Sequence, residues 1–296
     1  MSQLNRILAA TDLSAPARHA AERAAQVSKD TSAPLDLIHV ANLQPLERLR
    51  QFLGATSGEL ERQVLDVARQ SLHDLAGSLR RRFGVEAGIH VAAGTLLDEL
   101  SRSSDELGVD LLVCGAKGES IVRRLFLGTT ALRLLSLTTR PVLVVKLPPH
   151  ESYRKILVPV DFSPSSMRAI RHARSVAPQA ELVLVHAYDV PFKRQLRYAS
   201  SSMQEDSLDL YQMVARQEAI KKLDALCEEA GLSSQITHRF VLHGEPTLRI
   251  IEMEQKMDCD LIVMGKHGES RLNELLLGSV TKQVLAESQG DMLISV

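Results

Sequence analysis

The sequence lacks several features that define whole classes of protein. It contains no Trp, and aromatic residues make up only 3% of its 296 residues, which leaves few side chains to stack the bases of single-stranded nucleic acid. Lys and Arg together number 35 and Asp and Glu 36, so the formal net charge is −1. Because no overall field favours nucleic acid or an anionic membrane, we expect neither as a partner.

Cysteines and long apolar runs are also scarce. Cys114, Cys227 and Cys259 are too far apart in sequence to form a CxxC pair or a zinc-ligand spacing. No apolar stretch reaches the 18 residues of a membrane-spanning helix, and the run Ile7–Ala10 is too short for the core of a signal peptide. We therefore expect a soluble, uncleaved protein in the reducing cytoplasm.

The sequence is instead dominated by an internal repeat. The segment RILAATDLS at residues 6–14 returns as KILVPVDFS at residues 155–163, an offset of 149 residues (161 − 12). The match between DLLVCGAKGES at residues 110–120 and DLIVMGKHGES at residues 260–270 is closer, with an offset of 150. A period this long exceeds any solenoid unit, so it indicates duplication of a whole domain.

We predict two domains, residues 1–147 and 151–296, joined by a short extended linker with two adjacent prolines. Short branched apolar runs alternate with helical patterns in both domains, which is typical of buried parallel strands covered by helices. The first copy has expected strands near residues 5–11, 35–40, 85–92, 109–114 and 141–146. The prediction is an α/β fold: two five-stranded, doubly wound, Rossmann-like domains in tandem.

Helices and irregular segments complete this expectation. A helix over residues 15–30 follows the potential cap residue Ser14, and residues 59–82 show apolar positions at helical spacing. Residues 41–58 and 187–209 are mixed and polar. We expect loops or short helices in both segments.

A glycine pattern, G-x2-G-x9-G-[S/T], follows the fourth strand of each copy and leads into the last helix. It comprises Gly115, Gly118, Gly128 and Thr129 in the first copy, and Gly265, Gly268, Gly278 and Ser279 in the second. Glycines allow a sharp turn and close approach to a ligand, and the N–H groups of a helix start can hold phosphate oxygens. Plain turn glycines are the alternative, but the added helix start in both copies favours a phosphate site.

Both halves resemble universal stress protein domains over nearly the whole chain. In that family a first-strand Asp and this glycine pattern bind ATP. The resemblance implies that Asp12 and Asp161 lie at the adenine and ribose end, and that Lys117 and His267 can reach phosphates. The implied nucleotide-binding residues are Ala10, Asp12, Val40, Cys114, Gly115, Lys117, Gly118, Gly128, Thr129, Thr130, Pro159, Asp161, Ala187, Met264, Gly265, His267, Gly268, Gly278, Ser279 and Val280.

The two copies differ within this set. The first copy has Ala10, Cys114, Thr129 and Thr130 where the second has Pro159, Met264, Ser279 and Val280. The second copy keeps the family pattern more completely. We therefore expect it to bind nucleotide at least as tightly as the first.

The resemblance also bears on assembly. It places the fifth strands, residues 142–145 and 293–296, at the edges of their sheets, where bare apolar strands invite aggregation. We expect the two strands to pair, which makes an internal pseudo-dimer. Two such chains are expected to associate as a homodimer.

Other chemistries find little support. The sequence has no G-x4-G-K-[ST], no G-x-G-x-x-G after a strand, no S-G-G-x-D-S loop, and no H-E-x-x-H or G-x-S-x-G. His39 and His186 are more typical of hydrogen-bonded, partly buried histidines than of metal ligands, and Cys114 of an inert core thiol. We expect no metal site in the protein.

The resulting hypothesis is an ATP-binding stress-response regulator, with ATP bound with or without magnesium and at most slow hydrolysis. The alternative is a scaffold that binds no nucleotide and acts by association with an unidentified protein partner. A nucleotidyl-transfer or hydrolytic enzyme built on the same sheet is the weakest of the three.

Overall fold

The computed structural model describes residues 4–43, 57–116, 128–189, 205–268 and 277–296. Its strands are β1 (Ile7–Ala10), β2 (Leu35–Ala41), β3 (Ala87–Ala93), β4 (Leu111–Gly115), β5 (Val142–Val145), β6 (Lys155–Pro159), β7 (Glu181–Tyr188), β8 (Thr237–His243), β9 (Leu261–Gly265) and β10 (Asp291–Ser295). Its helices are α1 (Ala15–Thr31), α3 (Ser57–Phe83), α4 (Leu96–Leu107), α5 (Thr129–Leu137), α6 (Pro164–Val176), α8 (Glu205–Glu229), α9 (Pro246–Met257) and α10 (Ser279–Glu287).

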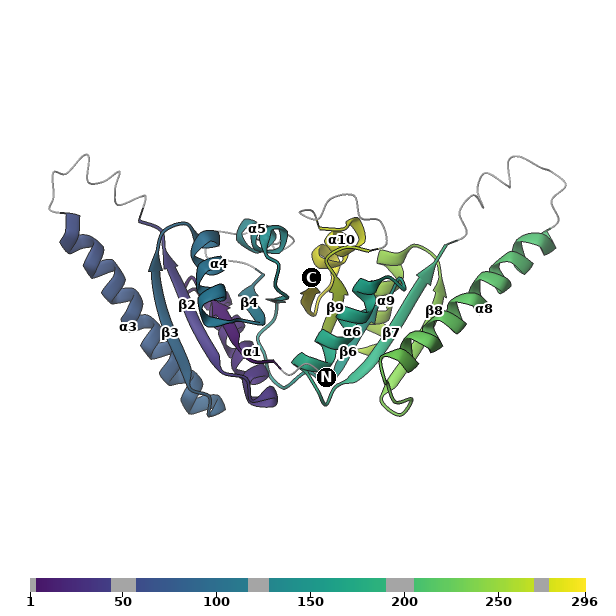
Figure 1. Ribbon diagram of the computed structural model, residues 1–296, viewed down its shortest axis with the longest axis horizontal. Helices are drawn as coiled ribbons and strands as arrows, with labels where there is room; N and C mark the ends of the chain where they lie inside the picture. The colour runs from purple at the N-terminus through teal and green to yellow at the C-terminus, as the bar shows by residue number, and fades with distance from the viewer. Residues whose placement is uncertain (1–3, 44–56, 117–127, 190–204, 269–276) are drawn as a thin grey trace.

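The strands form one ten-stranded sheet in the order β3-β2-β1-β4-β5-β10-β9-β6-β7-β8. Five neighbouring strands come from each half, and strands within a half pair in parallel. The halves lie side by side, with α3 and α8 at the two outer ends and α5 and α10 near the middle (Figure 1). The predicted five-stranded, parallel α/β architecture of each half is confirmed.

Helices cover both faces of the sheet because successive strand residues point to opposite sides. Ile7 and Ala9 pack in a core that includes residues of α1 and α3, whereas Leu8 packs in a second core that includes residues of α4 and α5. The second half repeats this arrangement with α6 and α8 on one face and α9 and α10 on the other. Within the described ranges, no helix has both the length and the apolar character to cross a membrane.

The halves are joined through their fifth strands, as the sequence predicted. Strands β5 and β10 pair antiparallel, with Leu143 opposite Leu293, and both of these leucines are fully buried. Each edge strand therefore covers the other, which removes the bare edge that would favour aggregation.

A buried ion pair between Arg23 and Asp291 also connects the two halves. The Asp291 carboxylate, at the start of β10, accepts hydrogen bonds from Arg23 Nε of α1 (3.2 Å) and from the Tyr153 hydroxyl (2.7 Å). It also accepts one from the backbone N–H of Lys146 (2.8 Å). Because Arg23 and Asp291 are both buried, their charges depend on each other for compensation.

The expectation of irregular structure over residues 41–58 and 187–209 is wrong at four places. Strand β2 extends through Ala41 and β7 through Tyr188, whereas α3 begins at Ser57 and α8 at Glu205. The polar residues at the start of α8 give no helical pattern of apolar positions. The helix is stabilised further along, where Ala219 and Leu223 are buried. Residues 44–56 and 190–204 lie outside the described part of the chain.

Candidate functional site

A cavity of about 310 Å³ lies at the carboxyl ends of β6, β7 and β9. Strands β6 and β9 are neighbours, but the sheet continues from β6 toward β7 and from β9 toward β10. Such a switch point is where open α/β sheets bind ligands. The lining residues are Pro159, Val160, Asp161, Ser165, Ser166, Val185, Ala187, Pro246, Ile250, Met264, Gly265, His267, Gly268, Gly278, Ser279, Val280 and Thr281.

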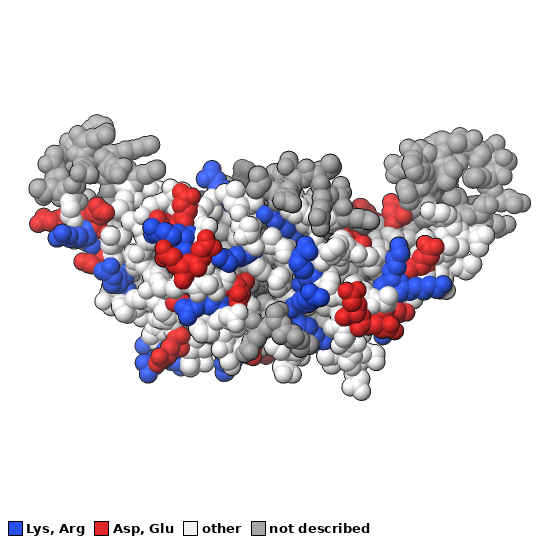
Figure 2. Space-filling view, viewed as in Figure 1, with Lys and Arg blue, Asp and Glu red and all other residues white. Residues whose placement is uncertain are grey.

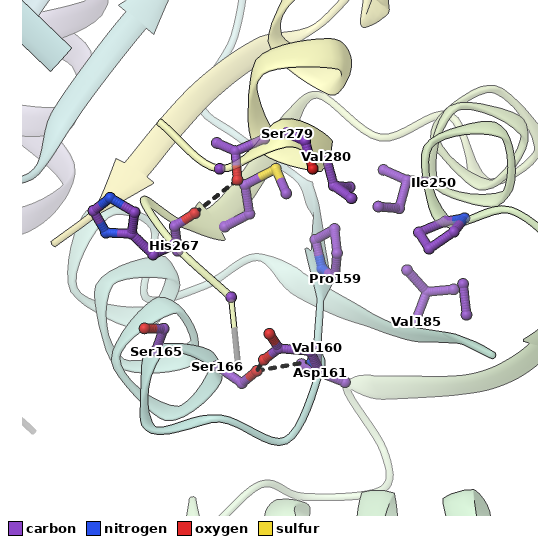
Figure 3. Close-up of a pocket in the computed structure, with 17 residues that line it drawn as sticks. Pro159, Val160, Asp161, Ser165, Ser166, Val185, Ile250, His267, Ser279 and Val280 are labelled. Atoms are coloured by element: carbon purple, nitrogen blue, oxygen red, sulfur yellow. Dashed lines mark hydrogen bonds between the residues drawn. The ribbon is translucent and has the colours of Figure 1, made fainter. Parts of the chain in front are cut away.

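The Asp161 carboxylate is fixed by the turn between β6 and α6. Its Oδ1 accepts hydrogen bonds from the Ser163 backbone N–H (3.0 Å) and from the hydroxyls of Ser163 (2.5 Å) and Ser166 (2.8 Å). Phe162, which lies between Asp161 and Ser163 in the chain, has φ +65°. This conformation costs energy for a residue with a bulky side chain. Figure 3 shows Ser166 bonded to Asp161 on one side of the cavity. The turn therefore holds an oriented carboxylate against the cavity.

The glycine loop after β9 approaches that carboxylate closely. A Cβ atom at position 268 would lie 2.6 Å from Asp161 Oδ2, and one at position 265 would lie 2.8 Å from Ser165 Cβ. Neither glycine is among those with positive φ. At both positions glycine allows close approach to neighbouring side chains of the protein, and a left-handed backbone is not the reason. The predicted close approach to a ligand stays a prediction.

Two hydrogen bonds connect the glycine loop to the start of α10. The Gly278 N–H donates to the Lys266 carbonyl (2.9 Å), and the Thr281 hydroxyl donates to the Gly265 carbonyl (3.0 Å). Gly278 is the N-cap, and no side-chain hydrogen bond caps this helix start. Such a start leaves N–H groups for an anion, which the helix dipole also favours.

His267 lines the cavity, and His186 lies beside it, between the lining residues Val185 and Ala187. His186 Nδ1 bonds to the Val160 carbonyl (2.8 Å), and burial lowers the pKa of this imidazole despite that bond and the nearby Asp161. His267 Nε2 is buried and has no hydrogen-bond partner among the described residues. His186 is thus explained by the fold, whereas the described residues supply no partner for His267 Nε2.

The chain matches known proteins in both halves. The model of the universal stress protein family matches residues 3–146 and 152–295. The chain belongs to the universal stress protein family.

Relatives agree in sequence and in fold. A universal stress protein of Methanocaldococcus jannaschii is 32% identical over 150 residues, which are 48% of this chain and 81% of the relative. One from Mycolicibacterium smegmatis is 24% identical over 307 aligned positions, covering 97% of this chain and 96% of the relative. A solved universal stress protein structure from Archaeoglobus fulgidus has a TM-score of 0.67 and 20% identity and covers 99% of both chains.

The second universal stress protein domain brings its predicted residues together. All ten of them line the cavity: Pro159, Asp161, Ala187, Met264, Gly265, His267, Gly268, Gly278, Ser279 and Val280. Sequence reasoning missed the other lining residues, Val160, Ser165, Ser166, Val185, Pro246, Ile250 and Thr281. Val185 and Ile250 look like ordinary core positions, but the Ser165 and Ser166 hydroxyls, four and five residues after Asp161 in the first turn of α6, offered a usable signal.

The first universal stress protein domain repeats the framework. Asp12 Oδ1 accepts a hydrogen bond from the Ser14 N–H (3.0 Å), Leu13 has φ +66°, and the Gly128 N–H donates to the Ala116 carbonyl (2.8 Å). These features match those of Asp161, Phe162 and Gly278.

The other predicted residues of the first copy lie at matching places. Ala10 ends β1, Val40 lies in β2, Cys114 and Gly115 end β4, and Thr129 and Thr130 begin α5. Burial raises the pKa of the Cys114 thiol to about 12, which fits the predicted inert core thiol. Lys117 and Gly118 lie outside the described residues.

Proposed function

We propose that this universal stress protein binds ATP in the cavity of its second half and acts as a nucleotide-responsive regulator. One observation carries the proposal: the ten residues selected from sequence motifs line a single cavity, although they span residues 159 to 280. Its volume, about 310 Å³, lies at the lower end of the range for small-molecule sites.

The two ends of the cavity differ in chemistry. Figure 3 shows Pro159, Val185 and Ile250 toward one end and His267 toward the other. Apolar walls suit the flat faces of adenine. The Asp161 carboxylate, positioned between the ends, suits the ribose hydroxyls because ionised acceptors form the stronger hydrogen bonds.

The phosphate end is built from backbone. Gly265 and Gly268 carry no Cβ, and no side chain caps the start of α10, so backbone N–H groups there suit phosphate oxygens. Within the described part of the chain, no three His, Cys, Asp or Glu side chains gather as a metal site. Magnesium that accompanies ATP would be held mainly by the phosphate oxygens of the nucleotide and by water.

The proposal includes at most slow hydrolysis, because the sequence carries none of the common hydrolase motifs. Calorimetric titration of the full chain with ATP, ADP and AMP tests it. Saturable ATP binding is expected, with affinity falling as phosphates are removed. Absence of binding by all three nucleotides would favour a scaffold that acts by protein association. Rapid steady-state turnover with magnesium would instead indicate an enzyme.

A further inference from the structure

Lys266 extends from the glycine loop of the second half into the first half. It lies between Gly265 and His267, which both line the cavity, and it is only 4% exposed. Its ammonium donates hydrogen bonds to the carbonyls of Ser136 (2.9 Å) and Thr138 (3.4 Å). These carbonyls belong to the C-terminal end of α5, where a cation is favoured by the helix dipole.

Helix α5 connects that contact with the other predicted site. It begins immediately after its N-cap Gly128, the third glycine of the first copy's motif. The helix has nine residues and is therefore about 14 Å long. Because an α-helix moves as a rigid rod, a shift at its C-terminal end changes the position of the N–H groups at its start.

The backbone of Lys266 is part of the second site. Its N–H donates to the Ser295 carbonyl (2.7 Å), and its carbonyl accepts from the Gly278 N–H at the start of α10 (2.9 Å). A ligand that adjusts the loop or the start of α10 therefore acts on the residue that holds α5. Burial also lowers the pKa of the Lys266 ammonium.

A second lysine makes the reverse connection. Lys146, which follows β5, donates from Nζ to the carbonyls of Leu285 (2.9 Å) and Ser288 (2.8 Å) at the C-terminal end of α10. The preceding residue, Val145, accepts a hydrogen bond from the Ala116 N–H in the first copy's glycine loop (2.8 Å). Each loop is thus connected to the last helix of the opposite half.

Duplication alone does not produce this exchange. At an offset of 150 residues, Lys266 corresponds to Ala116 and Lys146 corresponds to Val296. The two crossing lysines therefore occupy different positions in the repeat.

We propose that the two nucleotide sites are coupled, with Lys266 connecting the second glycine loop to α5, so that occupancy of one site changes the affinity of the other. This inference rests on the proposed function and extends it to a second site in the first half, where Asp12, Leu13 and Gly128 repeat the framework. The coupling is reciprocal by thermodynamic necessity.

Calorimetry on full-length chains measures the coupling. Gly268→Val and Gly118→Val each leave one working site and give the two single-site constants. In the parent, the product of the two stepwise ATP association constants should differ from the product of the two single-site association constants. We expect the ratio of these products to depart from one by at least about fivefold. Lys266→Met should bring this ratio to within about twofold of one. Lys282→Met, which removes an exposed lysine of α10, should leave the ratio as in the parent.

Hydrogen exchange supplies a readout that needs no nucleotide. Gly268→Val, which disturbs the second loop, should change exchange of the amides at residues 134–138 of the first half. The change should vanish when Lys266→Met is also present. A parent ratio of one, or unchanged exchange at residues 134–138 in Gly268→Val, would overturn the coupling. If no chain binds ATP, the proposed function fails, and the exchange data alone decide whether the loop acts on α5.

Discussion

A side chain at position 268 would meet the Asp161 carboxylate, so Gly268→Val should disturb both the loop and the Asp161 carboxylate. The added Cβ would lie 2.6 Å from Asp161 Oδ2. We expect ATP binding by the second half to fall by at least about 100-fold, which corresponds to the loss of charge-assisted hydrogen bonds. Gly268 is exposed and is not among the glycines with positive φ, so unfolding free energy should change by less than about 1 kcal/mol. Calorimetric titration and thermal unfolding measure the two effects.

Gly58→Val is the matched control for that change. Gly58 is exposed on α3, and a Cβ there would have nothing within 4 Å. The control should bind ATP as the parent does. Unchanged binding by Gly268→Val in a folded chain would contradict the phosphate cradle and support the scaffold alternative.

His172 should make stability fall on acidification. Its Nδ1 bonds to the Ser295 hydroxyl (2.7 Å), and burial, followed by the nearby Arg168, lowers the pKa of His172 from 6.5. Between that lowered pKa and 6.5 the unfolded chain binds a proton that native His172 excludes, so unfolding free energy decreases as pH falls through this window. The slope for one histidine is at most about 1.4 kcal/mol per pH unit. His186 acts in the same direction.

Urea unfolding at pH 7.5, 6.5 and 5.5 measures this dependence. The variant His172→Asn should flatten the slope. His150→Asn, at an exposed histidine, should keep the parent's slope. A steeper slope in His172→Asn would show that the sign is wrong.

At the scale of elements, Asp291 joins β10 to α1 of the other half through Arg23. Asp291→Asn leaves Arg23, which is 7% exposed, without its countercharge. Breaking a buried pair in this way typically costs about 3 to 5 kcal/mol, and we expect a loss in that range. Chemical denaturation measures this loss.

Asp258→Asn is the control. Asp258 is exposed and has φ +53°, a conformation that Asn tolerates, so the change should alter the free energy of unfolding by less than about 0.5 kcal/mol. Equal effects of the two changes would contradict a stabilising role for the pair.

The elements themselves could largely be predicted because strand and helix patterns differ in period. Leu111 to Cys114 form an unbroken apolar run, and a parallel strand covered on both faces requires such a run. The cap Ser14 was predicted correctly, since its hydroxyl accepts from the Ala17 N–H (3.4 Å). The start of α8 could not be predicted, because its support comes from distant residues of the sheet.

The glycine motif identified one end of the cavity, where we propose that phosphate binds, but other contacts depend on three-dimensional placement. Val185 and Ile250 line the cavity although their sequence neighbourhoods look like core. Lys266 reaches Ser136, 130 residues earlier in the chain, and no local pattern encodes that distance.

At the scale of the whole molecule, the paired fifth strands make the two halves parts of one sheet. Figure 2 shows positive and negative side chains interspersed over the drawn face, in keeping with the net charge of −1. A chain cut at the linker would expose β5 and β10 as bare edges. Comparisons between the halves therefore need the intact chain.

The second half should bind ATP at least as tightly as the first. The second half keeps Pro159, Met264 and Ser279, all of which line its cavity, where the first half has Ala10, Cys114 and Thr129. In intact chains, Gly118→Val leaves the second site and Gly268→Val leaves the first, so titrating both with ATP gives one binding constant for each half. Each variant should bind one equivalent. Tighter binding by the Gly268→Val chain would reverse the order and show that the substitutions in the first half improve the site.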